Sequence, residues 1–348
     1  MNLKDIKCVI WDLDNTLWEG VLLEGDQLYL KPGISEILQI LDSRGILLSI
    51  ASKNNYKETM EYLEQVGLAH YFLYPQIGWG PKSISVANIQ KSLNIGMDTI
   101  LFIDDQIFER DEVSAAHPEV SIVDASNYNK LLGMATLMPK VITEDSCRRR
   151  LMYIEEQQRK GDELVYQGTP IDFLKSLNMV FTISKANESD LQRAEELTVR
   201  TNQLNSTGVQ YSSDELKELL NSPHHHLWIC ELTDKYGSYG KIGLVLVEVQ
   251  EEAWVIHLLL MSCRVISRGV GTVLLSFLMK EAKAQAKGLR AVFRRTERNR
   301  QMLLTYQFAN FVERECVEDI IIFENDLTKI QEYPPYIQVD SLSKGGIA

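Results

Sequence analysis

Two aspartates, Asp12 and Asp14, directly follow an apolar run that covers residues 6–11. Such a run predicts a buried parallel strand, and open parallel sheets bind ligands beyond the carboxyl ends of their strands. Two carboxylates at a strand end cannot both be buried without a counter-ion. An isolated Asp-x-Asp sequence is as readily a solvated turn, so the function of this pair depends on what the neighbouring strands deliver.

Further polar residues follow two more predicted strands, 47–51 and 99–103, or open the helix predicted between them. They are Ser52, Lys53, Asn54, Lys82, Asp104 and Asp105. Because the carboxyl ends of parallel strands share one edge of a sheet, we expect these side chains to meet Asp12 and Asp14 there. The sequence therefore predicts one site built from acids, a hydroxyl and an ammonium group.

This combination suits phosphoryl transfer. One aspartate can attack phosphorus and form an aspartyl-phosphate, which splits a difficult displacement into two easier steps. The second can protonate the leaving oxygen and later activate water. Carboxylates repel a phosphate, so Mg²⁺ held by carboxylate oxygens is the expected cofactor. Ser52 and Lys82 would bind the transferring phosphoryl group.

A cysteine marks a second candidate site. The predicted strand 253–261 leads into Cys263 and Arg264, and a glycine-containing turn then opens a helix over residues 270–287. Free cysteine is usually a small buried hydrophobe. However, neighbouring arginines and a helix start favour the reactive thiolate form. Cys8 lies inside the first predicted strand, and we expect it to be a core residue.

The elements that position these residues form two patterns. The first 140 residues alternate strands with helices at 34–43, 56–66 and 82–93, which predicts a doubly wound parallel sheet. The segment between Thr16 and Lys31 is too short for a cap domain. Strands at 226–232, 241–250 and 253–261 predict a mixed α+β domain. The expected organisation is a first domain at 1–140, a helical linker at 141–171 and a second domain at 172–348.

Composition restricts the function classes. The chain has 348 residues, 45% hydrophobic and 24% charged, which indicates a soluble globular protein of two domains. A net charge of −12 argues against nucleic-acid binding, and no apolar run is long enough to span a membrane. Five scattered cysteines and the lack of an apolar signal stretch predict a cytoplasmic protein. Five arginines within residues 290–300 form a solvated helix start, a docking site for an acidic partner or a binding site for substrate phosphates.

The first set of motifs resembles the haloacid dehalogenase (HAD) superfamily of phosphohydrolases. The resemblance implies that Asp12 is the nucleophile and Asp14 the acid/base, while Ser52, Lys53, Asn54 and Lys82 bind substrate. It implies Mg²⁺ ligation by Asp12, Asp14, Asp105 and Asp104, with Glu109 as an alternative to Asp104. The strand, turn and helix around residues 253–287 resemble GNAT-type acyltransferases. Ile266 departs from their pattern, so coenzyme A is not expected, although a phosphopantetheine arm could enter the same cleft.

Both halves together resemble the FkbH-like glyceryltransferase/phosphatases of polyketide and tetronate-type biosynthesis. The matching residues are 8–18, 79–83, 102–105, 200–205 and 262–265. The resemblance implies that D-1,3-bisphosphoglycerate is the substrate and that an acyl carrier protein accepts the glyceryl group. A cysteine would hold glycerate as a thioester, with Arg264 and Asn202 binding the substrate. We place that thioester on Cys263, and Cys8 remains the alternative. The other function considered is a capless phosphatase whose second domain only binds substrate.

Overall fold

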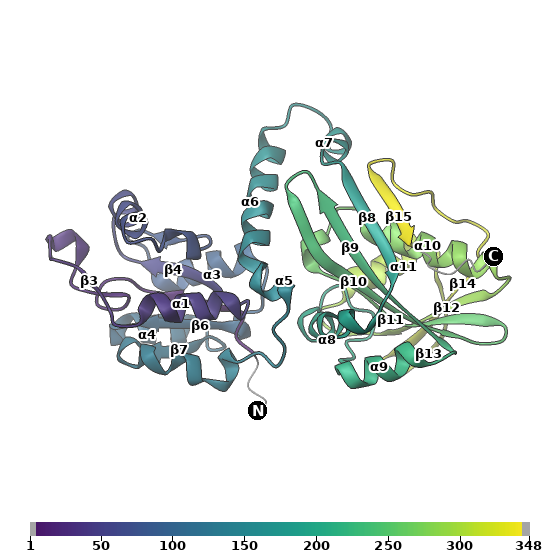
Figure 1. Ribbon diagram of the computed structural model, residues 1–348, viewed down its shortest axis with the longest axis horizontal. Helices are drawn as coiled ribbons and strands as arrows, with labels where there is room; N and C mark the ends of the chain where they lie inside the picture. Colours follow the sequence, from purple (N-terminus) through teal and green to yellow (C-terminus); the bar gives the residue numbers. More distant parts are fainter. Residues whose placement is uncertain (1–4, 343–348) are drawn as a thin grey trace. The chain divides into compact units, whose positions relative to one another are not determined.

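The computed structural model describes residues 5–342 and divides into two compact units (Figure 1). The first unit ends at Gln157 and the second begins at Gln158, so the boundary lies within helix α6 (Arg149–Val165). The predicted linker 141–171 therefore supplies residues to both units. Its expected end falls inside α7 (Pro170–Ser176).

A five-stranded parallel sheet forms the centre of the first unit, in the order β5-β4-β1-β6-β7. Its strands are β1 (Cys8–Trp11), β4 (Leu47–Ser52), β5 (Gln76–Ile77), β6 (Ile100–Asp104) and β7 (Ser121–Asp124). Trp11 lies opposite Ile50 of β4 on one side and Ile103 of β6 on the other. The strand order reverses between β1 and β6. In folds of this class, ligands bind at such a point, beyond the carboxyl ends of the strands.

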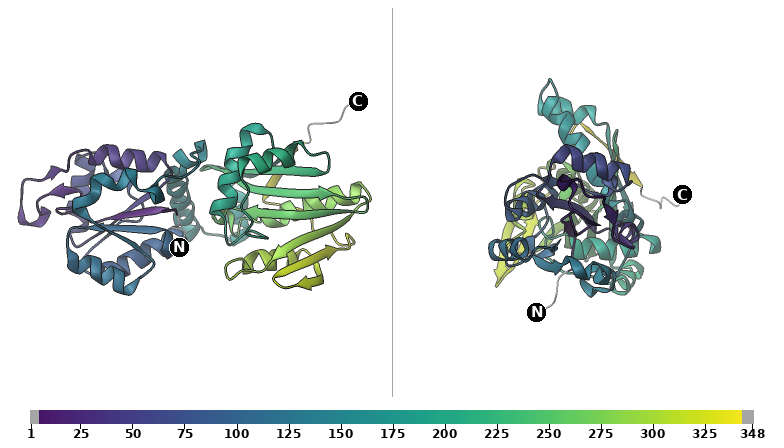
Figure 2. Two further views of the ribbon diagram at one scale, coloured as in Figure 1. Left: turned by 90° about the horizontal axis from the view of Figure 1, so that it is seen from below. Right: turned by 90° about the vertical axis from the view of Figure 1, so that its left-hand side faces the viewer.

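Helices cover both faces of this sheet (Figure 2). They are α1 (Ile34–Ser43), α2 (Tyr56–Gln65), α3 (Lys82–Leu93) and α4 (Ile107–Ala116). Successive residues of β1 point to opposite faces and are all buried: Val9 and Trp11 pack into one apolar cluster, and Cys8 and Ile10 into another. A strand buried on both faces gives a continuous apolar run in the sequence, so the predicted doubly wound sheet is confirmed.

A small flap follows the first strand in place of a cap domain. Strand β2 (Trp18–Glu19) pairs with β3 (Tyr29–Leu30) in antiparallel fashion, and a short 3₁₀ turn (Leu22–Glu24) lies between them. Within the part of the chain that the structure describes, nothing larger is inserted between Thr16 and Lys31.

The second unit contains an eight-stranded sheet in the order β13-β14-β12-β11-β10-β9-β8-β15. The strands are β8 (Met179–Lys185), β9 (His225–Asp234), β10 (Gly237–Val249), β11 (Ala253–Met261), β12 (Gly288–Arg294), β13 (Val312–Val317), β14 (Ile320–Asn325) and β15 (Ile337–Leu342). Neighbours are antiparallel except at β11·β12 and β8·β15. The predicted mixed α+β domain is confirmed, although the sequence analysis did not identify β8, β13, β14 or β15.

Helices also cover both faces of the second sheet. They are α8 (Leu191–Arg200), α9 (Ser213–Asn221), α10 (Val270–Ala284) and α11 (Arg300–Phe308). Residues of α8 and α9 pack into one apolar cluster, whereas residues of α10 and α11 pack into the largest cluster on the other face. Within residues 5–342, no helix combines the length and apolar character that crossing a membrane requires.

A buried ion pair holds the C-terminal part of α6 in the second unit. Arg159 Nε lies 2.6 Å from Asp234 Oδ2, and the two side chains are 1% and 0% exposed. The guanidinium also lies over the ring of Tyr239, 3.9 Å from its centroid, and the Tyr239 hydroxyl donates to Asp234. The pair thereby joins α6 to the hairpin formed by β9 and β10.

Arg159→Met should destabilise the second unit, because it leaves the Asp234 carboxylate buried without its cation. The expected loss is about 3–5 kcal/mol of unfolding free energy, measured by urea titration with tryptophan fluorescence. Arg314→Met is the matched control, because its pair with Glu324 (2.8 Å) is 59% and 34% exposed and should cost about 1 kcal/mol or less. Equal losses in the two variants would contradict a special role for Arg159.

Candidate functional site

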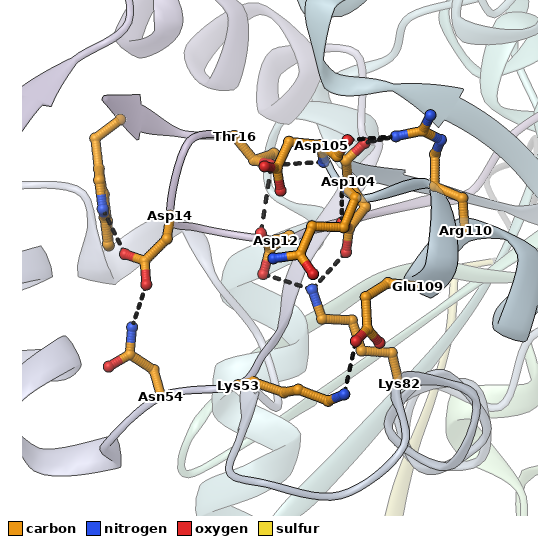
Figure 3. A network of polar contacts seen from close by, with 12 residues as sticks. Asp12, Asp14, Thr16, Lys53, Asn54, Lys82, Asp104, Asp105, Glu109 and Arg110 are labelled. Carbon is orange, nitrogen blue, oxygen red and sulfur yellow. Dashed lines mark hydrogen bonds and ion pairs between the residues drawn. The ribbon is translucent and has the colours of Figure 1, made fainter. Parts of the chain in front are cut away.

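A lysine between two aspartates forms the centre of the site in the first unit (Figure 3). Lys82 is the first residue of α3, and its Nζ lies 2.7 Å from Asp12 Oδ1. The same ammonium donates to Asp104 Oδ2 at the end of β6. All three side chains are almost completely buried. The geometry thus brings together predicted site residues that lie far apart in the sequence.

Thr16 joins the loops that follow β1 and β6. Its hydroxyl donates to Asp12 Oδ2 (3.3 Å) and accepts from the Asp105 backbone N–H (3.1 Å). Asp104 Oδ1 accepts from the Gln106 N–H (2.8 Å), which fixes the second oxygen of that carboxylate. The carboxylates are therefore held in defined orientations before any ligand binds.

The negative charge of this cluster exceeds what Lys82 can balance. Burial opposes the Lys82 ammonium, but the carboxylates of Asp12 and Asp104 outweigh it and raise the pKa of the lysine. Burial and then the charge of Asp12 raise the pKa of Asp104 to about 6. The same two causes raise the pKa of Asp105. The carboxylates compete for one ammonium, and a further cation would stabilise their charged forms.

The donor set fits a hard divalent cation. Asp12, Asp104 and Asp105 each offer a carboxylate oxygen, and these oxygens lie within 4.8 Å of one another. Asp105 Oδ1 is buried and has no hydrogen-bond partner among the described residues. Oxygen ligands of this kind are those that Mg²⁺ prefers. The three residues match three of the four predicted metal ligands.

The metal-ligand role of Asp14 stays a prediction, because its side chain lies apart from those of Asp12, Asp104 and Asp105. Asp14 Oδ1 accepts from Trp18 Nε1 (2.8 Å) and the Leu22 N–H (3.2 Å), and Oδ2 accepts from Asn54 Nδ2 (3.0 Å). The carboxylate therefore faces the flap, separate from the acidic cluster (Figure 3). Burial raises the pKa of Asp14, and the bonds from Leu22 and Trp18 only partly offset this effect. A carboxyl group that can hold a proton suits an acid/base role.

The predicted substrate-binding residues after β4 have different surroundings. Ser52 is buried at the strand end, while Lys53 Nζ donates to Glu109 Oε1 at 2.6 Å. Asn54 is 1% exposed, and its amide is used by Asp14 and by the Asn55 N–H. Asn54 thus orients the Asp14 carboxylate, and its contact with substrate stays a prediction.

Two residues that support the site were missed by the sequence analysis. Arg110 Nη1 donates to the backbone carbonyls of Asp104 (2.9 Å) and Asp105 (2.7 Å). Glu112 accepts from the Ser83 N–H (2.9 Å) and so fixes the first turn of α3, where Lys82 lies. The only signal for either was its position in the helix that follows the Asp104–Asp105 pair, because a charged residue on a helix is usually solvated.

The cysteine of the second candidate site lies at the end of β11. Cys263 is half-buried and begins a 3₁₀ turn that ends at Val265. Ser262 caps this turn and accepts from the backbone N–H of Arg264 (3.4 Å) and from its Nε (3.3 Å). Cys8, by contrast, is 0% exposed within β1, and burial raises the pKa of its thiol. Of these two thiols, only that of Cys263 is accessible.

Asn202 is exposed in the loop that follows α8. The Met261 N–H donates to the Leu204 carbonyl (2.8 Å), so this loop lies along the end of β11. Asn205 and Leu260 form an antiparallel bridge, and continuing that register brings Asn202 toward the Cys263 end of the strand. The structure therefore places the two predicted residues in neighbouring segments.

Solved structures resemble each unit separately. The N-terminal part of a Bacteroides fragilis protein, described as containing a phosphatase domain complexed with Mg, is 31% identical over 38% of this chain, with a TM-score of 0.34. The match spans only 40% of that chain. The ribosomal-protein-S18-alanine N-acetyltransferase from Escherichia coli is 16% identical over 44% of this chain and 97% of its own, with a TM-score of 0.34. A GNAT-family acetyltransferase from Streptococcus pneumoniae is 15% identical over 42% and 98%, with a TM-score of 0.32.

Sequence comparison finds a family that is similar to part of the first unit. No curated protein matches the chain. Residues 18–123 match the family model of haloacid dehalogenase-like hydrolases. The matched segment contains Lys82, Asp104 and Asp105, and Asp12 and Asp14 lie just before it. Over this segment, the first unit is therefore similar to haloacid dehalogenase-like hydrolases.

Proposed function

We propose that the first unit is a Mg²⁺-dependent phosphohydrolase in which Asp12 is the nucleophile. An Asp12 oxygen forms a bond to phosphorus, and the bond from phosphorus to the leaving oxygen breaks while Asp14 gives that oxygen a proton. Asp14 then takes a proton from water, which attacks the aspartyl-phosphate and releases inorganic phosphate. Mg²⁺ held by Asp12, Asp104 and Asp105 would offset the repulsion between carboxylates and phosphate.

One observation carries this proposal: the buried Asp12–Lys82–Asp104 cluster at the point where the strand order reverses. Burying several charged groups costs desolvation free energy and adds little to the stability of the fold. Such clusters therefore occur preferentially at functional sites. The phosphatase domain from Bacteroides fragilis, with Mg in its crystal structure, supports the choice of ion.

We further propose that the chain transfers a glyceryl group from D-1,3-bisphosphoglycerate to the phosphopantetheine thiol of an acyl carrier protein. The thiolate of Cys263 attacks the acyl carbon of the acyl phosphate, and inorganic phosphate leaves with the electrons of the carbon–oxygen bond that breaks. The carrier thiolate then attacks the resulting thioester and releases Cys263. The first unit removes the remaining phosphate ester. Support comes from the accessible strand-end thiol and from the family resemblance of the two halves.

The arginines at 290–300 support a carrier protein as partner. The side chains of Arg290, Arg294, Arg295, Arg298 and Arg300 are all exposed. Arg294 Nε pairs with Asp319 (3.3 Å), but this pair is half-exposed and leaves the surface basic. A basic surface on a chain with net charge −12 is suited to steering an acidic partner.

Asp12→Asn should abolish phosphate release, because an amide cannot form the phospho-intermediate. The expected loss is about 10³-fold or more in kcat, with an unchanged circular dichroism spectrum. EDTA should have the same effect on the native protein, and added Mg²⁺ should reverse it. Asp111→Asn, an exposed residue of the same unit, is the control. Undiminished phosphate release by Asp12→Asn would contradict the assignment of Asp12 as the nucleophile.

Incubation with D-1,3-bisphosphoglycerate should add one acyl mass to the peptide that contains Cys263, and hydroxylamine should remove it. Cys263→Ala should lose this adduct and carrier loading, yet retain phosphatase activity at Asp12. Cys8→Ala should load the carrier normally, with a packing cost of about 1 kcal/mol. An adduct on Cys8 would contradict the placement of the transfer step. Normal phosphate release with no adduct would favour the alternative in which the second unit only binds substrate.

Charge reversal of Arg294 and Arg295 to Glu should raise KM for the carrier protein by about tenfold while leaving phosphatase turnover unchanged. Rising salt should also raise the KM of the native protein for the carrier, because the Debye length shortens to about 3 Å at 1 M salt. Lys175→Glu with Lys217→Glu is the matched control, since these lysines of the same unit are 53% and 52% exposed and also paired with acids. Equal effects of the two double variants would argue against a specific docking surface.

A further inference from the structure

Two parallel neighbours in the second sheet, β11 and β12, are paired over only part of their length. The pairing runs from Ala253 with Gly288 to Ile256 with Ala291. Beyond this point, β11 continues to Met261 and β12 to Arg294. The backbone groups of these last residues face the space between the two strands and need other partners.

Residues 204–206 supply those partners. The Ser206 N–H donates to the Leu259 carbonyl (2.9 Å), and the Leu259 N–H donates to Ser206 Oγ (3.0 Å). The Met261 N–H donates to the Leu204 carbonyl (2.8 Å). On the other side, the Arg294 N–H donates to the Ser206 carbonyl (2.9 Å). The segment thus bonds to both strands, as an inserted strand would.

Two asparagines fix this segment. The Asn205 amide nitrogen donates to the Thr201 carbonyl (3.2 Å), and its Oδ1 accepts from the N–H groups of Thr207 (3.1 Å) and Gly208 (2.9 Å). Asn299 Nδ2 donates to the carbonyls of Asn205 (3.1 Å) and Arg294 (2.8 Å). Asn205 and Asn299 are 0% and 1% exposed. The segment is therefore an integral part of the core and not a surface loop.

A space between diverging strands is a natural site for an extended ligand, which adds to the sheet through backbone hydrogen bonds. In this chain the bonding groups of Leu259, Met261 and Arg294 are already used. A pantetheine-length arm therefore has no free strand edge there to pair with.

Side chains from other parts of the second unit also lie against the turn before α10. Gly269 caps the helix with φ 79°, and a Cβ at this position would come 2.7 Å from the Tyr336 hydroxyl. Arg268 is 4% exposed and lies 3.7 Å from a carboxylate oxygen of Glu163. An aromatic ring against the turn and an acidic side chain beside it disfavour a bound pyrophosphate, which needs open N–H groups at a helix start.

We propose that residues 204–206 are a built-in strand that excludes coenzyme A and its acyl thioesters from the second unit. Acyl chemistry is then confined to the end of β11, where Cys263 is accessible to a small acyl phosphate. The acyl transfer at Cys263 rests on the proposed function, whereas the exclusion of coenzyme A does not. A phosphopantetheine arm would then reach the thioester at the end of β11 without entering the space between the two strands.

Hydrogen exchange of the full chain tests this inference without an activity assay. The amides of Ser206, Leu259, Met261 and Arg294 should exchange as slowly as those of the β10–β11 ladder, and coenzyme A should leave their rates unchanged. Calorimetric titration with coenzyme A or acetyl-coenzyme A should give no saturable binding. Fast exchange of these amides that slows on adding coenzyme A, or saturable binding, would overturn the proposal and make the segment a displaceable gate.

Asn299→Ala tests what fixes the segment. Loss of the bonds to the carbonyls of residues 205 and 294, and of the bond that Asn299 Oδ1 accepts from the Thr296 N–H (2.9 Å), should speed exchange at residues 205, 206 and 294 by about tenfold and leave the β10–β11 amides unchanged. Asn221→Ala is the matched control, because this exposed amide donates to one backbone carbonyl, that of Lys217 (3.0 Å). Equal exchange in both variants would refute the role of Asn299. If Cys263 gains no acyl group but the exchange results hold, the glyceryl-transfer proposal fails and the exclusion of coenzyme A stands.

Discussion

The first unit depends on one electrostatic constraint: several carboxylates converge where the strand order of a buried parallel sheet reverses. The continuous apolar strands β1 and β6 are adjacent, so the aspartates that follow them must share one edge. Lys82 provides the positive charge that lies directly between Asp12 and Asp104. The raised pKa values of Asp104 and Asp105 reflect the remaining excess of negative charge. In the proposed reaction, a divalent cation would balance the acids and a phosphate would balance the lysine.

The acid/base residue requires the opposite surroundings, and the flap supplies them. Asp14 is only two residues from Asp12, yet Trp18, Leu22 and Asn54 turn its carboxylate away from the cluster. Burial raises the pKa of Asp14, and a carboxyl group that can hold a proton suits the proton donor of the proposed reaction. A flap of two short strands achieves this while leaving the sheet edge without a cap domain.

Sequence reasoning succeeded where a physical signal is local. Apolar runs that end in polar residues located β1, β4 and β6. It failed where the determining contact is distant. Strand β13 has no buried residue, so it has no buried face to produce a periodic pattern. Strand β15 pairs with β8 across more than a hundred residues, a contact that no local signal reports. Residue type identified Asn54 as a site residue, but only the fold shows that its amide faces Asp14.

The two units differ in what their candidate sites leave unsatisfied, which is negative charge in the first and no backbone hydrogen bond of residues 259, 261 and 294 in the second. In the first, buried charges gather at the carboxyl ends of β1 and β6, where the proposed cation and phosphate would balance them. The second fills the space between β11 and β12 with residues 204–206, so the chain completes its own hydrogen bonding. A site that is already satisfied gains nothing by binding an extended cofactor, because each new hydrogen bond would replace an existing one. In the proposed transfer, the reacting group of the second unit is therefore a side chain beside this segment, the half-buried thiol of Cys263 at the end of β11.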